Sequence, residues 1–248
     1  MRRTGDKSLD CPADDAFLVK YLRCRKYRVE ETFEVIRNYF RVRKRLPDVF
    51  INLSPHNIPY HKIIVRNRLI QIAKQRDPQG RAVAMMKLGA WNTGICSITD
   101  LLRAALVMAE WTLENEETQI RGVVGVFDLK GFNISHLAHF TPFFIKKLAH
   151  IVEDCYPSRL KAVHVLNNPY FYELLYAMIK PFMKSKLAQR FHFTGRDLSK
   201  LHGILPPECI PAEFGGTNEE FDYCSQERDV KSTEDYYQRV SRWGYHTE

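Results

Sequence analysis

Residues 122–132 read GVVGVFDLKGF, and the rest of the chain is organised around this stretch. Its middle is an apolar run rich in valine, closed by Asp128 and Gly131. Such a run predicts a short strand that is buried on both faces, as in the interior of a parallel sheet. Three further segments have the composition to pair with it: Ala82–Leu88, Leu160–Leu166 and Phe191–Phe193. Because helical patterns separate these segments, the sequence predicts an α/β fold with a largely parallel sheet.

The length and composition limit the fold and the class of partner. With 248 residues, 45% of them apolar, the chain suffices for one large domain, or for one domain with a small helical annex. Its formal net charge is +8 and its isoelectric point is about 9.2. This charge predicts an anionic partner, either nucleic acid or an anionic membrane. The alternative is a soluble protein that is simply basic.

The cysteines and the apolar runs indicate where the protein works. Six cysteines occur, none of them in a CxxC pair, and the N-terminus has no secretory apolar region. These features are typical of reduced cysteines in a cytosolic protein, not of a disulfide framework or a zinc site. No apolar stretch approaches the length of a membrane span. We therefore expect any membrane contact to be peripheral.

Helix signals lie on both sides of the predicted strands. Asp14 and Asp15 offer N-caps for one helix, and a second helix is predicted over residues 30–45, before a proline. This basic pair predicts a small N-terminal annex. Thr99 with Asp100, and Thr141 with Pro142, mark the starts of two longer helices.

Residues 170–190 form a separate amphipathic segment. They carry one wide apolar stripe with lysine and arginine around it, and Pro181 is expected to kink the helix. Such a helix suits either the core, with one solvated face, or a mobile lid that touches a membrane. Periodicity alone favours the core helix.

The sequence offers no recognised catalytic motif. It has no GxxxxGKS/T phosphate loop, no GxGxxG after a strand, no HExxH and no GxSxG. The nine histidines show no ligand-like spacing, and Asp128 at a strand end suits a base or a turn cap equally well. Since nothing supplies a nucleophile, a base and an orienting group together, we expect no enzyme, no metal site and no cofactor.

Five parts of the chain, in the same order, resemble the CRAL-TRIO lipid-binding family and, within it, the tocopherol-transfer and retinaldehyde-binding members. They are Phe17–Arg25, Arg76–Val83, residues 117–131, residues 156–169 and Leu205–Gly216. The resemblance implies a sheet floor flanked by helices that enclose a lipid cavity under a mobile lid helix. It also implies three regions: a short, truncated N-terminal helical region (1–51), the lipid-binding domain (52–216) and a polar C-terminal tail (217–248).

The resemblance implies two sets of site residues. The cavity-lining set is Leu102, Ala105, Leu106, Ala109, Phe127, Phe132, Phe140, Leu148, Ile151 and Val163, with Leu175, Met178, Ile179 and Phe182 on the lid. The phosphoinositide-binding set is Arg25, Arg159, Lys161, Lys186 and Arg190. Phe132 stands where the family often has tryptophan, so the resemblance leaves the ligand open between tocopherol-like and retinoid-like molecules.

Together these expectations describe a lipid-transfer protein that holds one hydrophobic molecule and exchanges it at phosphoinositide-containing membranes. We expect a cytoplasmic monomer, peripheral on endosomal or other anionic membranes, that binds no nucleic acid. The alternative is a phosphoinositide-sensing adaptor of endosomal trafficking that moves no cargo. A third class, an α/β enzyme, is disfavoured by the missing motifs.

Overall fold

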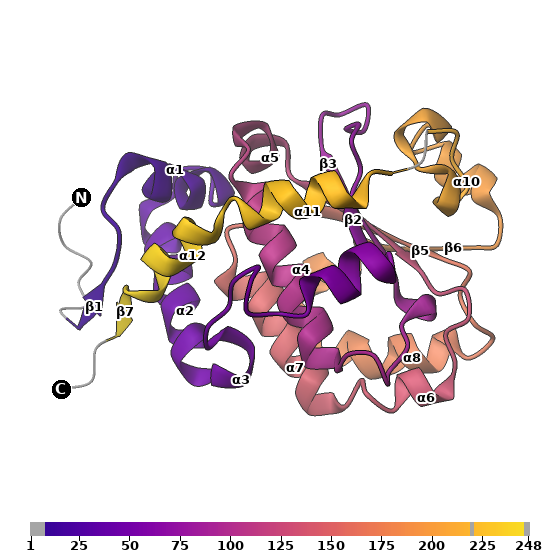
Figure 1. Cartoon of the computed structure of the whole chain (residues 1–248), viewed down its shortest axis with the longest axis horizontal. Helices are drawn as coiled ribbons and strands as arrows, with labels where there is room; N and C mark the ends of the chain where they lie inside the picture. The colour runs from indigo at the N-terminus through magenta and orange to yellow at the C-terminus, as the bar shows by residue number, and fades with distance from the viewer. Residues whose placement is uncertain (1–7, 219–220, 246–248) are drawn as a thin grey trace.

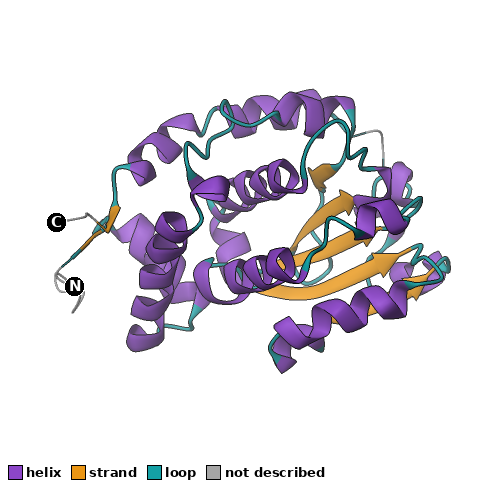
Figure 2. Ribbon diagram, turned by 90° about the horizontal axis from the view of Figure 1, so that it is seen from below, coloured by secondary structure: helices purple, strands orange, loops and turns teal. Residues whose placement is uncertain are grey.

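A five-stranded sheet forms the centre of the computed structural model, which describes residues 8–218 and 221–245 (Figures 1 and 2). Its order is β2 (Ile70–Ile72), β3 (Ala82–Lys87), β4 (Val123–Asp128), β5 (Leu160–Leu166) and β6 (Phe191–Gly195). Strands β3 to β6 are parallel, which confirms the α/β fold and all three predicted pairing segments. β2 joins the edge antiparallel to β3.

β2 is the strand that sequence analysis missed. It has only three residues, too few to show an alternating pattern. Its outer edge is covered, because the Ile72 N–H donates to Gln226 Oε1 over 2.9 Å. A side chain from the C-terminal part of the chain therefore closes this edge against pairing with another strand.

The connections between the parallel strands are helical. β3 leads to α4 (Ile98–Leu113) and α5 (Glu116–Arg121), and β4 leads to α6 (Ile134–Leu137) and α7 (Pro142–His150). A π-helical turn, η3 (Ile151–Cys155), continues α7. α4 begins earlier than predicted, because Ser97 and Asp100 form a reciprocal capping box. Thr141 caps α7 as predicted.

The N-terminal annex consists of α1 (Asp15–Cys24), α2 (Val29–Arg45) and α3 (Pro47–Phe50). Asp14 caps α1 by accepting a hydrogen bond from the Phe17 N–H over 2.9 Å. α2 ends before Pro47, as the sequence predicted. In Figure 1 these helices lie beside the sheet domain and next to the C-terminal helices.

The segment 170–190 differs from the single kinked helix that we expected. It forms α8 (Tyr172–Ile179), one 3-10 turn η4 (Lys180–Phe182) and the short α9 (Ser185–Ala188). Pro181 has no N–H to donate to the preceding turn, and Met183 and Lys184 adopt extended backbone. The helix therefore breaks, where a kink was predicted.

The C-terminal segment is also more ordered than a polar tail. α10 (Leu198–His202) precedes the family-like ending, and α11 (Tyr223–Lys231) and α12 (Glu234–Ser241) run across the molecule in Figure 1. The hydroxyl of Tyr237 donates to the Val107 carbonyl over 2.9 Å, and that of Tyr236 donates to buried Glu110 over 2.7 Å. Finally, β7 (Gly244–Tyr245) pairs with β1 (Leu9–Asp10).

The two faces of the sheet have different neighbours. On one face Val124 and Val126 are fully buried against Leu201, Leu205 and Ile210 from the segment after β6. The other face, which carries Phe127 and Val163, packs with residues from α6 and α8. Because successive side chains along a strand point to opposite faces, β4 contributes side chains to both faces of the sheet.

His164 of β5 is an exception among the buried side chains. It is 1% exposed, and neither of its ring nitrogens has a hydrogen-bond partner among the described residues. Its ring stacks on that of His192 in β6, with centroids 5.2 Å apart. Burial first, and then the charges of His192 and Arg81, lower the pKa of His164 to about 4.

We predict that His164 makes folding stability depend on pH. Between about pH 6.5 and pH 4 the unfolded chain binds a proton that the folded chain excludes, so the free energy of unfolding falls as the pH falls. The full effect is about 3 kcal/mol. Urea unfolding of His164→Leu across this range should show a flatter slope than the parent. His192→Gln should keep most of the slope, because burial is the larger cause; equal slopes in the parent and His164→Leu would contradict the prediction.

Candidate functional site

The apolar floor of the candidate site lies on the Phe127 face of the sheet. Ala84, Gly125 and Val163 stand side by side on β3, β4 and β5. There is room for a side chain at Gly125, because a Cβ added there would lie 3.7 Å from its nearest neighbours, which is an ordinary contact distance. Phe127 remains partly exposed although it lies on the central strand. The floor therefore carries little side-chain volume at its centre.

α4 presents a stripe of small side chains beside this interior. Ala105 and Ala109 are partly exposed, whereas Ala104 and Val107 on the same helix are fully buried. Both alanines pack on the main core cluster, so they belong to the interior and not to a solvated surface. Open space beside this stripe stays a prediction.

The predicted lining residues fall into two adjoining apolar clusters. One contains Leu102, Ala105, Leu106, Ala109, Leu148 and Ile151. The other contains Phe127, Phe132, Val163, Leu175 and Ile179. Phe140 packs on both clusters, and its ring lies 5.8 Å from that of Phe132. Met178 and Phe182 are half-buried on residues 170–190, the predicted lid and hereafter the lid segment, outside both clusters. The role of all these residues as cavity lining stays a prediction.

The lid segment is attached to the rest of the molecule by polar contacts near its C-terminal end. The Lys184 N–H donates to Glu153 Oε1 over 2.9 Å, and the Lys184 ammonium pairs with Asp154. On α8 itself, Leu175 is buried while Leu174 is 57% exposed. One face of α8 thus closes the apolar interior, and the other face meets solvent.

A basic cluster lies at the amino ends of the parallel strands. Arg159 and Lys161 stand at the start of β5, and Arg190 directly precedes β6. Gly122 lets these chains approach: its φ is +95°, and a Cβ there would lie 2.3 Å from the Arg159 carbonyl oxygen. Three members of the predicted phosphoinositide set are therefore brought together from separate segments.

The electrostatics of Lys161 show how close these charges are. Burial first, then the positive charges of Arg159, Arg190, Arg81 and Lys26, lower the pKa of its ammonium. Lys26 and Arg81 were missed by sequence analysis, because they lie far along the chain and only the fold brings them near β5. The hydrogen bond from Arg28, and then the charges of Arg28, Arg25 and Lys186, lower the pKa of Glu31. That carboxylate therefore lies beside this part of the cluster.

The arginines of the cluster are oriented by neutral groups. Arg25 donates to the Glu153 carbonyl over 3.2 Å, Arg159 to the Ile120 carbonyl and Arg190 to the Leu160 carbonyl. A carbonyl fixes a guanidinium without neutralising its charge. These cations therefore remain available to an anion.

Other site classes find little support. Asp128 accepts hydrogen bonds from the Lys130 N–H and the Asn167 amide, each over 2.8 Å, so it holds loops together. Over residues 8–218 and 221–245 no group of three or more metal-ligating side chains occurs. In the same residues no helix has the length and apolarity needed to cross a membrane. An open pocket of about 930 Å³ lies at the carboxyl ends of the strands and shares only Phe132 with the predicted lining.

Comparisons with known proteins agree with this geometry. Residues 66–216 match the CRAL/TRIO domain. The chain is 36% identical over 235 residues to a human alpha-tocopherol transfer protein-like protein, covering 95% of this chain and 68% of that one. It is 33% identical to Xenopus laevis clavesin-1, covering 84% of this chain and 63% of the relative. The crystal structure of Sfh5 has the same fold, with a TM-score of 0.61 at 16% identity, covering 86% of this chain and 74% of that one.

Two phenylalanine substitutions on α4 test whether space lies beside the alanine stripe. Ala109→Phe should fill that space, abolish binding of retinol or a fluorescent tocopherol analogue, and cost at most about 1–3 kcal/mol of stability. Ala104→Phe makes the same change at a fully buried position and should destabilise the protein more. Chemical denaturation and ligand fluorescence measure both effects. Unchanged ligand affinity in folded Ala109→Phe, or equal destabilisation by the two changes, would contradict the placement.

Proposed function

Because the chain belongs to the CRAL-TRIO lipid-binding family, we propose that it carries one hydrophobic lipid, tocopherol-like or retinoid-like, between membranes inside the cell. The observation that carries this proposal is the apolar interior between the sheet floor, α4 and α8. The floor has no side chain at Gly125, and the bordering alanines keep partial exposure. A site of this kind selects its ligand by shape, with few polar contacts.

The energetics suit a carrier that performs no covalent chemistry. Burying a hydrocarbon chain contributes about 0.8 kcal/mol per methylene, so an extended isoprenoid or polyene supplies its own affinity. The same ligand is costly to release into water. Transfer therefore requires an opening at a membrane, where the apolar surface of the cargo stays covered.

The basic cluster supports a phosphoinositide membrane as the place of exchange. Glu153 connects the cluster to the lid segment: its carbonyl accepts from Arg25, and its carboxylate accepts from the Lys184 N–H. An anionic head group bound at Arg159, Lys161 and Arg190 would thus lie next to the lid. It would also relieve the repulsion among these cations, so we expect the pKa of Lys161 to rise on binding.

The double change Lys186→Ala with Arg190→Ala tests the membrane step. Each basic residue near an anionic surface contributes about 1 kcal/mol, so binding to phosphoinositide vesicles should weaken roughly thirtyfold. Lipid transfer should fall with it, ligand affinity in solution should not change, and parent binding should weaken with added salt. Vesicle co-sedimentation and a fluorescent transfer assay measure both steps.

The matched control is Lys62→Ala with Arg66→Ala, which removes one exposed lysine and one exposed arginine that are not among the charges lowering the pKa of Lys161. It should bind and transfer like the parent. If the cluster variant co-sediments as well as this control, the cluster is only a solvated face. If the parent binds vesicles but moves no cargo, the protein is a phosphoinositide-sensing adaptor.

A further inference from the structure

We propose that the pocket at the carboxyl ends of β4, β5 and β6 is a second ligand site, which binds the anionic head and the adjoining apolar part of an amphiphile. Its volume is about 930 Å³, a size typical of small-molecule sites. It lies at the opposite end of the strands from the basic cluster. Lys130 follows β4, Asn167 and Asn168 follow β5, and Arg196 follows β6.

The pocket is built before any ligand arrives. Asp128 at the end of β4 accepts from the Asn167 amide over 2.8 Å, which ties the first loop to the second. The Asn168 side-chain oxygen accepts from the Gly195 N–H over 3.1 Å, which ties the second loop to the end of β6. Because three segments are already fixed to one another, a ligand pays little to order them.

Most of the side-chain polar groups left over in this pocket are donors, although the Asn167 amide oxygen, whose N–H donates to Asp128, is an acceptor among them. Hydrogen bonding through its oxygen leaves the Asn168 amide N–H groups free to donate. The side chains of Lys130 and Arg196 have no ion-pair partner among residues 8–218 and 221–245, and no carboxylate lines the pocket. Asp128, the nearby acid, accepts from the two loop groups. This set of groups favours a phosphate or a carboxylate.

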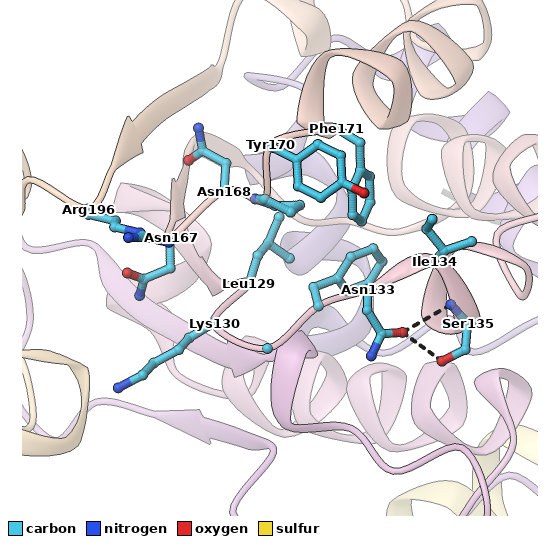
Figure 3. A pocket seen from close by; sticks show the side chains of 13 residues that line it. Leu129, Lys130, Asn133, Ile134, Ser135, Asn167, Asn168, Tyr170, Phe171 and Arg196 are labelled. Atoms are coloured by element: carbon cyan, nitrogen blue, oxygen red, sulfur yellow. Dashed lines mark hydrogen bonds between the residues drawn. The ribbon is translucent and has the colours of Figure 1, made fainter.

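The rest of the lining is apolar and aromatic. Figure 3 shows Lys130 and Arg196 at one end of the pocket and Ile134 at the other, with Tyr170 and Phe171 between them. The Tyr170 side chain is 89% exposed and Ile134 is 64% exposed, although both are large and apolar. Phe171 packs edge-on to Tyr170, with ring centroids 5.1 Å apart. A charged end beside an uncovered apolar wall matches an amphiphilic anion better than a bare phosphate ion.

Octyl phosphate is a suitable probe, with 1-octanol as its uncharged counterpart. In amide NMR titrations of the full chain, octyl phosphate should shift residues 129–135, 167–171 and 195–196. We expect 1-octanol to bind these residues at least about tenfold more weakly, because it cannot use the two cations. Equal affinities for the two probes, or shifts confined to the residues around Ala105 and Ala109, would overturn the proposal.

Three variants complete the test. Lys130→Ala with Arg196→Ala should weaken octyl phosphate binding at least about tenfold, while Lys62→Ala with Arg66→Ala should not. Tyr170→Ala removes an exposed ring without disturbing the fold and should weaken binding severalfold. Unchanged affinity in the first double variant would refute the site. Since the pocket shares only Phe132 with the proposed cargo lining, and neither Lys130 nor Arg196 belongs to that lining, this result leaves the transfer hypothesis standing.

A competition experiment identifies the source of the amphiphile. Vesicles that contain phosphatidic acid present the same phosphate chemistry within a membrane. If these vesicles displace octyl phosphate from the pocket, the site binds a lipid within a membrane. If monomeric lysophosphatidic acid displaces the probe and the vesicles do not, the ligand is a free amphiphile; failure of both would contradict the proposal.

Discussion

The alternation of side chains along β4 is the constraint on which the structure depends. Val124 and Val126 are sealed against the segment after β6, so this face of the sheet is closed by the chain itself. The opposite face carries Gly125 and a partly exposed Phe127, which leaves the helices around it to close over an apolar floor. The same six-residue strand thus supplies both a packed core and the floor of the candidate lipid site.

The parallel arrangement of the strands also places the basic side chains apart from the apolar floor. The amino ends of β5 and β6 gather Arg159, Lys161 and Arg190 at one side of the sheet. Burial first, and then repulsion by the neighbouring cations, lowers the pKa of Lys161, and backbone carbonyls hold the arginines without neutralising them. A bound anion would relieve this repulsion, and this is the physical basis of the proposed membrane contact. The lid meets the cluster through Glu153.

The sequence predicted the parts of the fold that have long or well-capped signals. The valine-rich strand, its three parallel partners, and the caps at Asp14 and Thr141 were all confirmed. β2 was not predicted, because three residues are too few to show a hydrophobic period. At Pro181 the helix breaks, where only a kink was expected. The sequence could not predict the surroundings of residues that are placed by contacts distant along the chain. Lys26 and Arg81 join the basic cluster only through the fold. Tyr237 is buried although the sequence around it is mostly polar.

The central claim is that the interior between the sheet and α8 holds one hydrophobic molecule. Native mass spectrometry of the protein as purified from cells, followed by lipid extraction, tests this most directly. The account predicts a 1:1 complex whose extra mass is released into organic solvent as a single class of neutral isoprenoid or polyene lipid. Finding only the bare 29.1 kDa chain, in a preparation that also takes up no tocopherol or retinoid when offered them, would contradict it.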